Sequence, residues 1–189
     1  MRRAKVTERP DRMEGDHLGF YTEFPTREGE QVLMRTAISF VSLEGAEANF
    51  KVELKGEDFG RYCEKAAALW DEALSKIKIF GGTEDERTIF YTSLYHTMID
   101  PRDYRDVTGE YVGGDRKVYK TDAFKKRTVF SGWDVFRSQF PLQNLINPEV
   151  VNDMINSFVT LAEENGTGVY ERWEFLNAYS GCMLGNPAI

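Results

Sequence analysis

The chain has 189 residues, of which 41% are hydrophobic, and its formal net charge is -7 at pH 7. That length suits one domain or two small ones and is enough to bury a sizeable core. Acidic and basic residues are intermixed without a basic cluster, so we expect no nucleic-acid partner. No apolar run is long enough to span a membrane, and residues 1–16 show no signal-peptide pattern.

The residue types that most often serve nucleophilic or metal sites are few. The only histidines are His17 and His96, which argues against a histidine-based metal site or a hydrolase triad. Cys63 and Cys182 lie far apart, each in an apolar setting, and are predicted to be buried free thiols. These two cysteines do not indicate whether the protein works in an oxidising or a reducing compartment.

The amino-terminal part predicts a polar lead-in followed by strands. Residues 1–16 are highly polar, and we expect them to be disordered. Mixed alternation of apolar residues predicts strands over residues 20–24 and 32–43, and residues 44–59 are predicted to be a polar connector. Two strands bury little by themselves, so they pack on later elements or belong to a larger sheet that begins outside this sequence.

Three helices are predicted from apolar periodicity and end signals. The first covers residues 61–80 and ends at Gly81-Gly82. Thr83 followed by Glu86 forms a capping-box pattern that opens the second. An Asn-Pro-Glu start signal opens the third, over residues 148–165, whose apolar stripe is predicted to be core.

Residues 103–120 lie between these helices and are rich in turn residues. Thr108-Gly109 and Gly113-Gly114 predict turns around a small hairpin. Three aspartates raise the alternative of a calcium loop: Asp103, Asp106 and Asp115. Their spacing does not match the EF-hand pattern, and the favoured interpretation is that they are turn formers.

The stretch 131–137 holds the first candidate site. Asp134 and Arg137 stand three residues apart beside Trp133, and helical spacing would place the acid and the base on one face. An aromatic platform with neighbouring charged groups suits a sugar. The simpler alternative is a helix start with one local salt bridge and core aromatics, and local chemistry alone favours it.

The carboxyl-terminal stretch holds the second candidate cluster, Glu171, Trp173 and Glu174. Glycoside hydrolysis needs two carboxyl groups about 5–10 Å apart, and Asp134 with Glu171 or Glu174 would supply such a pair. The chain has 31 acidic residues, so accidental pairs are many and residues alone assign no catalysis. Residues 181–189 are predicted to open another helix, and an end in mid-element predicts a truncated chain.

Several motifs follow one another in a recognisable order: residues 38–46, 90–98, 101–102, 106–111, 131–137 and 181–185. In this order they resemble glycoside hydrolase family 92, the exo-acting, calcium-dependent, inverting α-mannosidases, over residues 35–189. The resemblance implies a β-sandwich joined by a helical linker to an (α/α)6 barrel. The expected fold class is mainly α with a small β portion.

The resemblance also implies domain limits. Residues 17–55 would be the last strands of the sandwich, residues 56–82 the linker helix, and residues 83–189 the first part of the (α/α)6 catalytic domain. Both domains would be incomplete, and exposed apolar helix faces would favour self-association. Relatives of this kind act on mannose-containing glycans, use calcium, and are secreted or periplasmic.

Residue roles follow from the same resemblance. Asp134 is expected to grip the terminal mannose, Trp133 and Arg137 to shape the pocket, and Trp173 and Glu174 to be further pocket candidates. The general acid, the base and the main calcium ligands are expected beyond Ile189, so we expect this chain to hold no catalytic residue or metal ligand and to be inactive alone. Two alternatives stay open: a non-catalytic carbohydrate-binding module, and an (α/α)6 glycosidase with Asp134 and Glu174 as its carboxylates.

Overall fold

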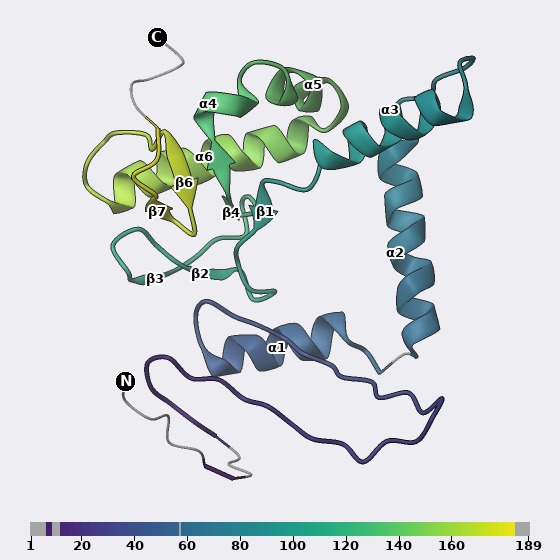
Figure 1. Ribbon diagram of the computed structural model, residues 1–189. Coiled ribbons are helices and arrows are strands. Elements are labelled where there is room, and N and C mark those ends of the chain that lie inside the picture. The colour runs from purple at the N-terminus through teal and green to yellow at the C-terminus, as the bar shows by residue number, and fades with distance from the viewer. Residues whose placement is uncertain (1–6, 9–11, 57, 184–189) are drawn as a thin grey trace. The chain divides into compact units, whose positions relative to one another are not determined.

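The computed structural model describes residues 7–8, 12–56 and 58–183, in two compact units, Met1–Met34 and Arg35–Ile189 (Figure 1). The described residues of the first unit contain no helix or strand. A turn forms near the predicted position, where the amide of Glu30 donates to the carbonyl of Arg27 at 3.0 Å.

The two predicted strands are not formed. Over residues 20–24 and 32–42 the structure records no strand pairing, and the side chains of Phe20 and Tyr21 are 81% and 73% exposed. Strand geometry is stabilised by neighbours that pair the backbone N–H and C=O groups, and the described chain offers no such neighbours here. Membership of a larger sandwich stays a prediction.

The second unit contains a helix where a polar connector was predicted. α1 (Leu43–Glu53) begins directly after Ser42, whose hydroxyl accepts a hydrogen bond from the Gly45 amide at 2.9 Å. A serine in this position satisfies one of the free amides of the first turn. The cap therefore marked a helix that the weak apolar pattern of this segment did not reveal.

A buried carboxylate joins α1 to the loop that follows β1. Asp106 accepts from Asn49 Nδ2 at 2.8 Å and from Ser39 Oγ at 2.6 Å. Gly45 lies against it, and a Cβ there would stand 2.2 Å from Asp106 Oδ2. No side chain fits at this position, which explains a glycine inside a helix.

Gly45→Ala in the full-length protein is expected to lower the free energy of unfolding by about 1–3 kcal/mol, because the added methyl group overpacks the Asp106 contact. Alanine would otherwise favour the helix by about 1 kcal/mol. Denaturant titration measures the effect, and Glu44→Ala, at an exposed position of the same helix, is the control. Unchanged stability of Gly45→Ala would contradict this close contact.

Helices α2 (Phe59–Leu74) and α3 (Glu84–His96) confirm the first two predicted helices, but α2 ends well before Gly81-Gly82. The predicted capping box is present. The Glu86 amide donates to Thr83 Oγ1 at 3.2 Å, and the Thr83 amide donates to Glu86 Oε2 at 2.7 Å. The two helices pack through rings of Trp70 and Tyr95, whose centroids are 4.5 Å apart.

The prediction that both cysteines are buried is wrong. Cys63 and Cys182 are free and exposed. Cys63 lies on α2, a helix without a buried residue, because α2 packs mainly on α3 and its apolar side stays open. Cys182 follows the last strand in a segment whose described residues are all exposed.

Three small antiparallel sheets lie between α3 and the end of the described chain (Figure 1). The first pairs β1 with β4, and the second is the predicted hairpin of β2 and β3. The third has the order β5-β6-β7. The strands are β1 (Arg102–Asp103), β2 (Glu110–Val112), β3 (Val118–Lys120), β4 (Arg127–Thr128), β5 (Phe130–Ser131), β6 (Trp173–Phe175) and β7 (Ala178–Tyr179).

Helices α4 (Gly132–Val135), α5 (Gln139–Ile146) and α6 (Pro148–Glu164) follow β5. α6 is the third predicted helix, and its residues Met154 and Leu161 belong to the core. α5 and α6 lie side by side and form the main helical packing of this unit (Figure 1).

The described chain is mainly helical with small sheets, as predicted. The helix predicted over residues 181–189 is absent from residues 181–183, and residues 184–189 lie outside the described residues. In the part of the chain that the structure describes, no helix has the length and apolar character needed to cross a membrane.

Candidate functional site

A cavity of about 160 Å³ lies where β5, α4, α5 and β6 meet. It brings together Asp134 and Trp173, one residue from each candidate cluster. Sheet pairing explains this, because Ser131 stands opposite Trp173 in the β5–β6 ladder. The lining residues are Asp100, Pro101, Val129, Phe130, Ser131, Asp134, Val135, Gln139, Phe140 and Trp173.

Asp134 lies on α4, where it lines the cavity and is exposed. Its Oδ2 accepts a hydrogen bond from Ser131 Oγ at 2.6 Å, and this contact orients the carboxylate. Its other oxygen makes no hydrogen bond with the described residues. A carboxylate only accepts hydrogen bonds, so this group suits a ligand that carries hydroxyl donors.

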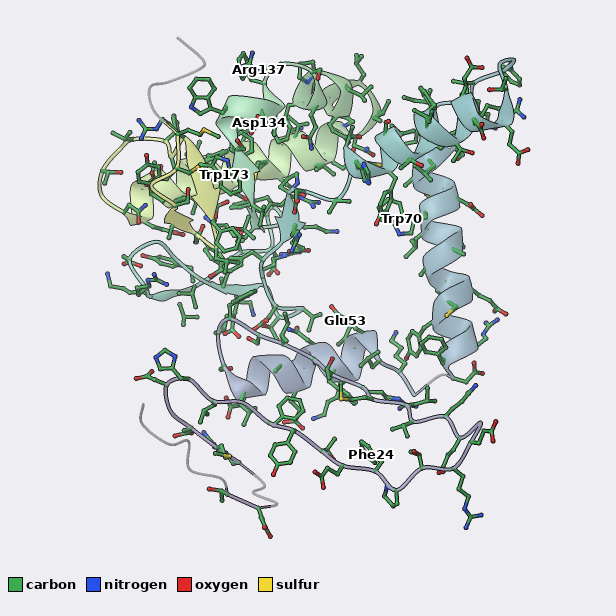
Figure 2. The ribbon with its side chains drawn as sticks, in the orientation of Figure 1. Phe24, Glu53, Trp70, Asp134, Arg137 and Trp173 are labelled. Atoms are coloured by element: carbon green, nitrogen blue, oxygen red, sulfur yellow. The ribbon has the colours of Figure 1, made fainter. Side chains whose placement is uncertain are left out.

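Arg137 and Trp133 do not line the cavity. Asp134 and Arg137 were predicted to share a helix face; α4 ends at Val135, and Arg137 follows in a turn in which its amide donates to the Asp134 carbonyl at 3.4 Å. No ion pair joins them; instead Arg137 Nε donates to the Trp133 carbonyl at 3.3 Å, and the guanidinium carbon of Arg137 lies 5.1 Å from the centre of the Phe136 ring. Trp133 Nε1 is buried and lacks a hydrogen-bond partner among the described residues. Figure 2 shows Asp134 and Arg137 beside α4 and Trp173 on β6.

Neighbouring residues of β6 point to opposite faces, as in any strand. Trp173 faces the cavity, whereas the side chain of Glu174 is buried on the other side and only 1% exposed. Glu174 Oε1 accepts from Thr128 Oγ1 at 2.6 Å and from the Asn177 amide at 2.5 Å. Burial raises the pKa of Glu174, and these hydrogen bonds and nearby Lys126 oppose the rise. Burial likewise raises the pKa of Glu171, which lies outside the cavity lining.

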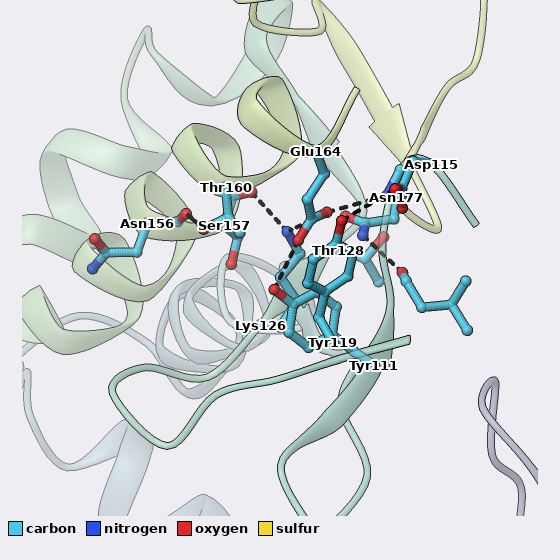
Figure 3. A network of polar contacts seen from close by, with 12 residues as sticks. Tyr111, Asp115, Tyr119, Lys126, Thr128, Asn156, Ser157, Thr160, Glu164 and Asn177 are labelled. Carbon is cyan, nitrogen blue, oxygen red and sulfur yellow. Dashed lines mark hydrogen bonds and ion pairs between the residues drawn. The ribbon is translucent and has the colours of Figure 1, made fainter. Parts of the chain in front are cut away.

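Lys126 is fully buried, and sequence reasoning missed it. Its Nζ donates to the Ser157 carbonyl at 3.0 Å and lies 3.8 Å from Glu164 Oε2 (Figure 3). Desolvation lowers the pKa of Lys126 to about 8, against the opposing effects of Glu164 and Glu174. The one available signal was the spacing of Lys126 and Thr128, two residues apart in a strand-like run, which predicts that they share a face; both are buried.

Glu164, at the end of α6, ties the β2–β3 hairpin to this lysine. Its Oε1 accepts from Tyr111 OH at 2.8 Å, and its Oε2 accepts from the Gly114 amide at 3.1 Å. Lys126 Nζ also lies 5.0 Å from the centre of the Tyr111 ring. Burial raises the pKa of Tyr111. Lys126, Glu164 and Tyr111 therefore form a network in which a charged pair contacts a phenol.

Stability should rise with pH through Lys126. The unfolded lysine keeps its proton up to its ordinary pKa of about 10.4, whereas the folded one loses it near 8. Between these values the unfolded chain binds more protons, which favours folding as pH rises. We expect the free energy of unfolding of the wild type minus that of Lys126→Met to grow by at most about 1.4 kcal/mol per pH unit above pH 8. A difference that stays flat from pH 7 to 10 would contradict the lowered pKa.

No metal centre is formed by the described residues alone. In the described ranges no three His, Cys, Asp or Glu side chains gather in a way that would hold a metal ion. Of the three loop aspartates, Asp106 is bound by Ser39 and Asn49, and Asp115 by Lys117 and Tyr119. Asp103 lies exposed on β1. Because Asp106 and Asp115 already have partners within the chain, these positions do not fit a calcium ion.

Comparison with known families identifies the chain. The model described as the glycosyl hydrolase family 92 catalytic domain matches residues 45–189. The chain belongs to glycosyl hydrolase family 92. The match includes both walls of the cavity and the whole stretch 131–137. No curated protein matches the sequence significantly.

The chain is similar to several solved structures of family 92 proteins. The α-mannosidase BT3965 from Bacteroides thetaiotaomicron is 35% identical, with a TM-score of 0.74 over 79% of this chain and 20% of that one, and it has also been solved in complex with mannoimidazole. The inverting mannosidase BT2199 from the same species is 30% identical, with a TM-score of 0.72 over the same shares. The glycosyl hydrolase ccman5 is 30% identical, with a TM-score of 0.63 over 69% of this chain and 18% of its own. The chain thus spans about a fifth of the length of these structures.

Proposed function

We propose that this chain is part of an exo-acting, inverting α-mannosidase that removes terminal α-mannose from glycans. The observation that carries the proposal is the cavity in which Asp134 and Trp173 meet, in a chain that belongs to family 92. An aromatic ring offers an apolar surface to a sugar ring, and a carboxylate accepts hydrogen bonds from its hydroxyls. Mannoimidazole bound to a family 92 α-mannosidase supports the choice of mannose.

The proposal gives each candidate residue a role. Asp134 binds the hydroxyls of the terminal mannose, and Ser131 holds its carboxylate through the 2.6 Å hydrogen bond. Trp173 forms the apolar wall. Trp133 and Arg137 brace the α4 segment at the rim, where the Trp133 carbonyl and the Arg137 side chain are already joined.

The cavity forms only part of the proposed sugar pocket. Its volume of about 160 Å³ is below the roughly 300–1,000 Å³ of complete ligand pockets. Inverting hydrolysis needs an acid and a base on opposite sides of the bond. Asp100 also lines the cavity but accepts a hydrogen bond from Arg102 Nε at 2.8 Å, and Glu174 is covered by Thr128 and Asn177. We therefore propose that the general acid, the general base and the calcium ligands belong to segments outside this sequence, and that this chain alone is inactive.

Mannose release by the full-length protein tests the proposal. Incubation with α-mannosides, β-mannosides and α-glucosides should give hydrolysis of the first only, and NMR should detect β-mannose as the initial product. Residues 1–189 alone should release no mannose. Initial formation of α-mannose would overturn inversion, and binding of mannosides by an inactive full-length protein would favour a carbohydrate-binding module instead.

A further inference from the structure

The chain turns sharply at Val129, directly before the cavity. Thr128 pairs with β1, whereas Phe130 pairs with β6, so the chain changes sheets at the residue between them. Val129 makes this corner with a φ of 67°. A β-branched side chain rarely adopts a positive φ. Such a conformation persists only where neighbouring contacts hold it in place, and such residues gather at functional sites.

A second strained turn faces this corner. β6 and β7 are joined by Leu176 and Asn177, which have φ values of 50° and 61°. Two successive positive values are required by the tight hairpin turn whose twist matches the strands, and glycine or asparagine is usual there. Leucine is not a usual residue in this position. Each of the two turns therefore contains one residue, Val129 or Leu176, in a conformation that its side chain does not favour.

Glu174 and Thr128 link the two turns. Thr128 Oγ1 donates to Glu174 Oε1 at 2.6 Å and accepts from the Leu176 amide at 2.7 Å. Glu174 Oε1 also accepts from the Asn177 amide at 2.5 Å. The pair is almost completely buried, with Thr128 2% and Glu174 1% exposed. The two hydrogen bonds of Thr128 join the Val129 corner to the β6–β7 hairpin, and the bond from the Asn177 amide holds Glu174 against its own turn.

We propose that Glu174 and Thr128 are positioning residues that hold the Val129 corner against the β6–β7 turn and thereby set the separation of Asp134 and Trp173 across the cavity. The proposal rests on the proposed function, because it concerns the same sugar pocket. Trp173 directly precedes Glu174 on β6, and Asp134 follows the corner by one short strand and one turn of helix. A shift at the buried pair therefore moves both walls, although neither Glu174 nor Thr128 lines the cavity.

The substitution Thr128→Val in the full-length protein tests this role, because valine keeps the shape and removes both hydrogen bonds. We expect it to weaken mannoimidazole binding by about tenfold to a hundredfold, the loss that a displacement of about 1 Å of binding groups produces. Thr128→Ser keeps the hydroxyl and should restore most of the affinity. Thr160→Val removes a threonine hydroxyl bonded only within α6, to the Asn156 carbonyl, and should leave binding unchanged.

Glu174→Gln is the second variant and keeps an oxygen acceptor, so we expect it to fold and to lose less affinity than Thr128→Val. Wild-type affinity in Thr128→Val, or an equal loss in Thr128→Ser, would overturn the positioning role. A crystal structure of Thr128→Val separates this claim from the proposed function. If the wild type neither binds nor hydrolyses mannosides, the proposed function fails, yet the Asp134–Trp173 separation must still change in the variant. An unchanged separation would overturn the inference.

Discussion

Asp134→Ala should lower kcat/KM of the full-length protein on α-mannosides by about 10- to 150-fold, because a hydrogen bond to a charged group is worth about 1.5–3 kcal/mol. The fold should persist, since Asp134 is exposed and its described side-chain contact is the hydrogen bond from Ser131. We expect both the affinity for the sugar and the stabilisation of the transition state to fall. Mannoimidazole titration measures the first, and steady-state kinetics measure kcat/KM.

Two matched variants sharpen the Asp134 experiment. Asp134→Asn keeps the shape and one acceptor oxygen and should lose less activity than Asp134→Ala. Asp71→Ala removes an exposed carboxylate on α2, away from the cavity lining, and should be neutral. Near-normal kinetics for Asp134→Ala would show that Asp134 does not bind the sugar.

Lys126→Met is the substitution with the largest expected effect on stability. The lysine is completely buried beside Glu164, whose side chain is 4% exposed. Removing one partner of a buried ion pair leaves the other charge uncompensated and costs about 3–5 kcal/mol. Denaturant titration of the full-length protein should show this loss in the domain that contains residues 102–179, and the β2–β3 hairpin should lose its protection from hydrogen exchange.

The neighbouring lysine supplies the control for this prediction. Lys125 has an exposed side chain, so Lys125→Met should change the free energy of unfolding by no more than about 0.5 kcal/mol. Combining Lys126→Met with Glu164→Gln also removes the unpaired carboxylate charge. The double variant should recover part of the lost free energy of unfolding, because residues in one network are coupled. A Lys126→Met variant as stable as Lys125→Met would show that the buried charge pair contributes nothing to folding.

Local signals predicted several elements of this fold well. The capping box of Thr83 and Glu86 marked the start of α3, and the apolar stripe after Pro148 marked α6. α1 was missed because its helix is weakly amphipathic, although Ser42 carried a cap. The strands predicted at residues 20–24 and 32–43 failed for another reason: a strand depends on partners, and alternation along one segment does not supply them.

The candidate site was predictable in its residues but not in its geometry. Asp134 and Trp173 were both singled out, yet they meet only because Ser131 pairs with Trp173 across a long stretch of sequence. The roles of Lys126 and Thr128 depend on burial, which charge and polarity alone would not suggest. The face of Glu174 followed from strand alternation only once β6 was known to pair with β5.

A crystal structure of the full-length protein with mannoimidazole would show directly whether Asp134 and Trp173 bind the sugar. We expect the Asp134 carboxylate to accept hydrogen bonds from the sugar hydroxyls and Trp173 to line the same pocket, with Glu174 buried behind it. A sugar bound at a place that neither Asp134 nor Trp173 reaches would contradict the proposed roles of both residues.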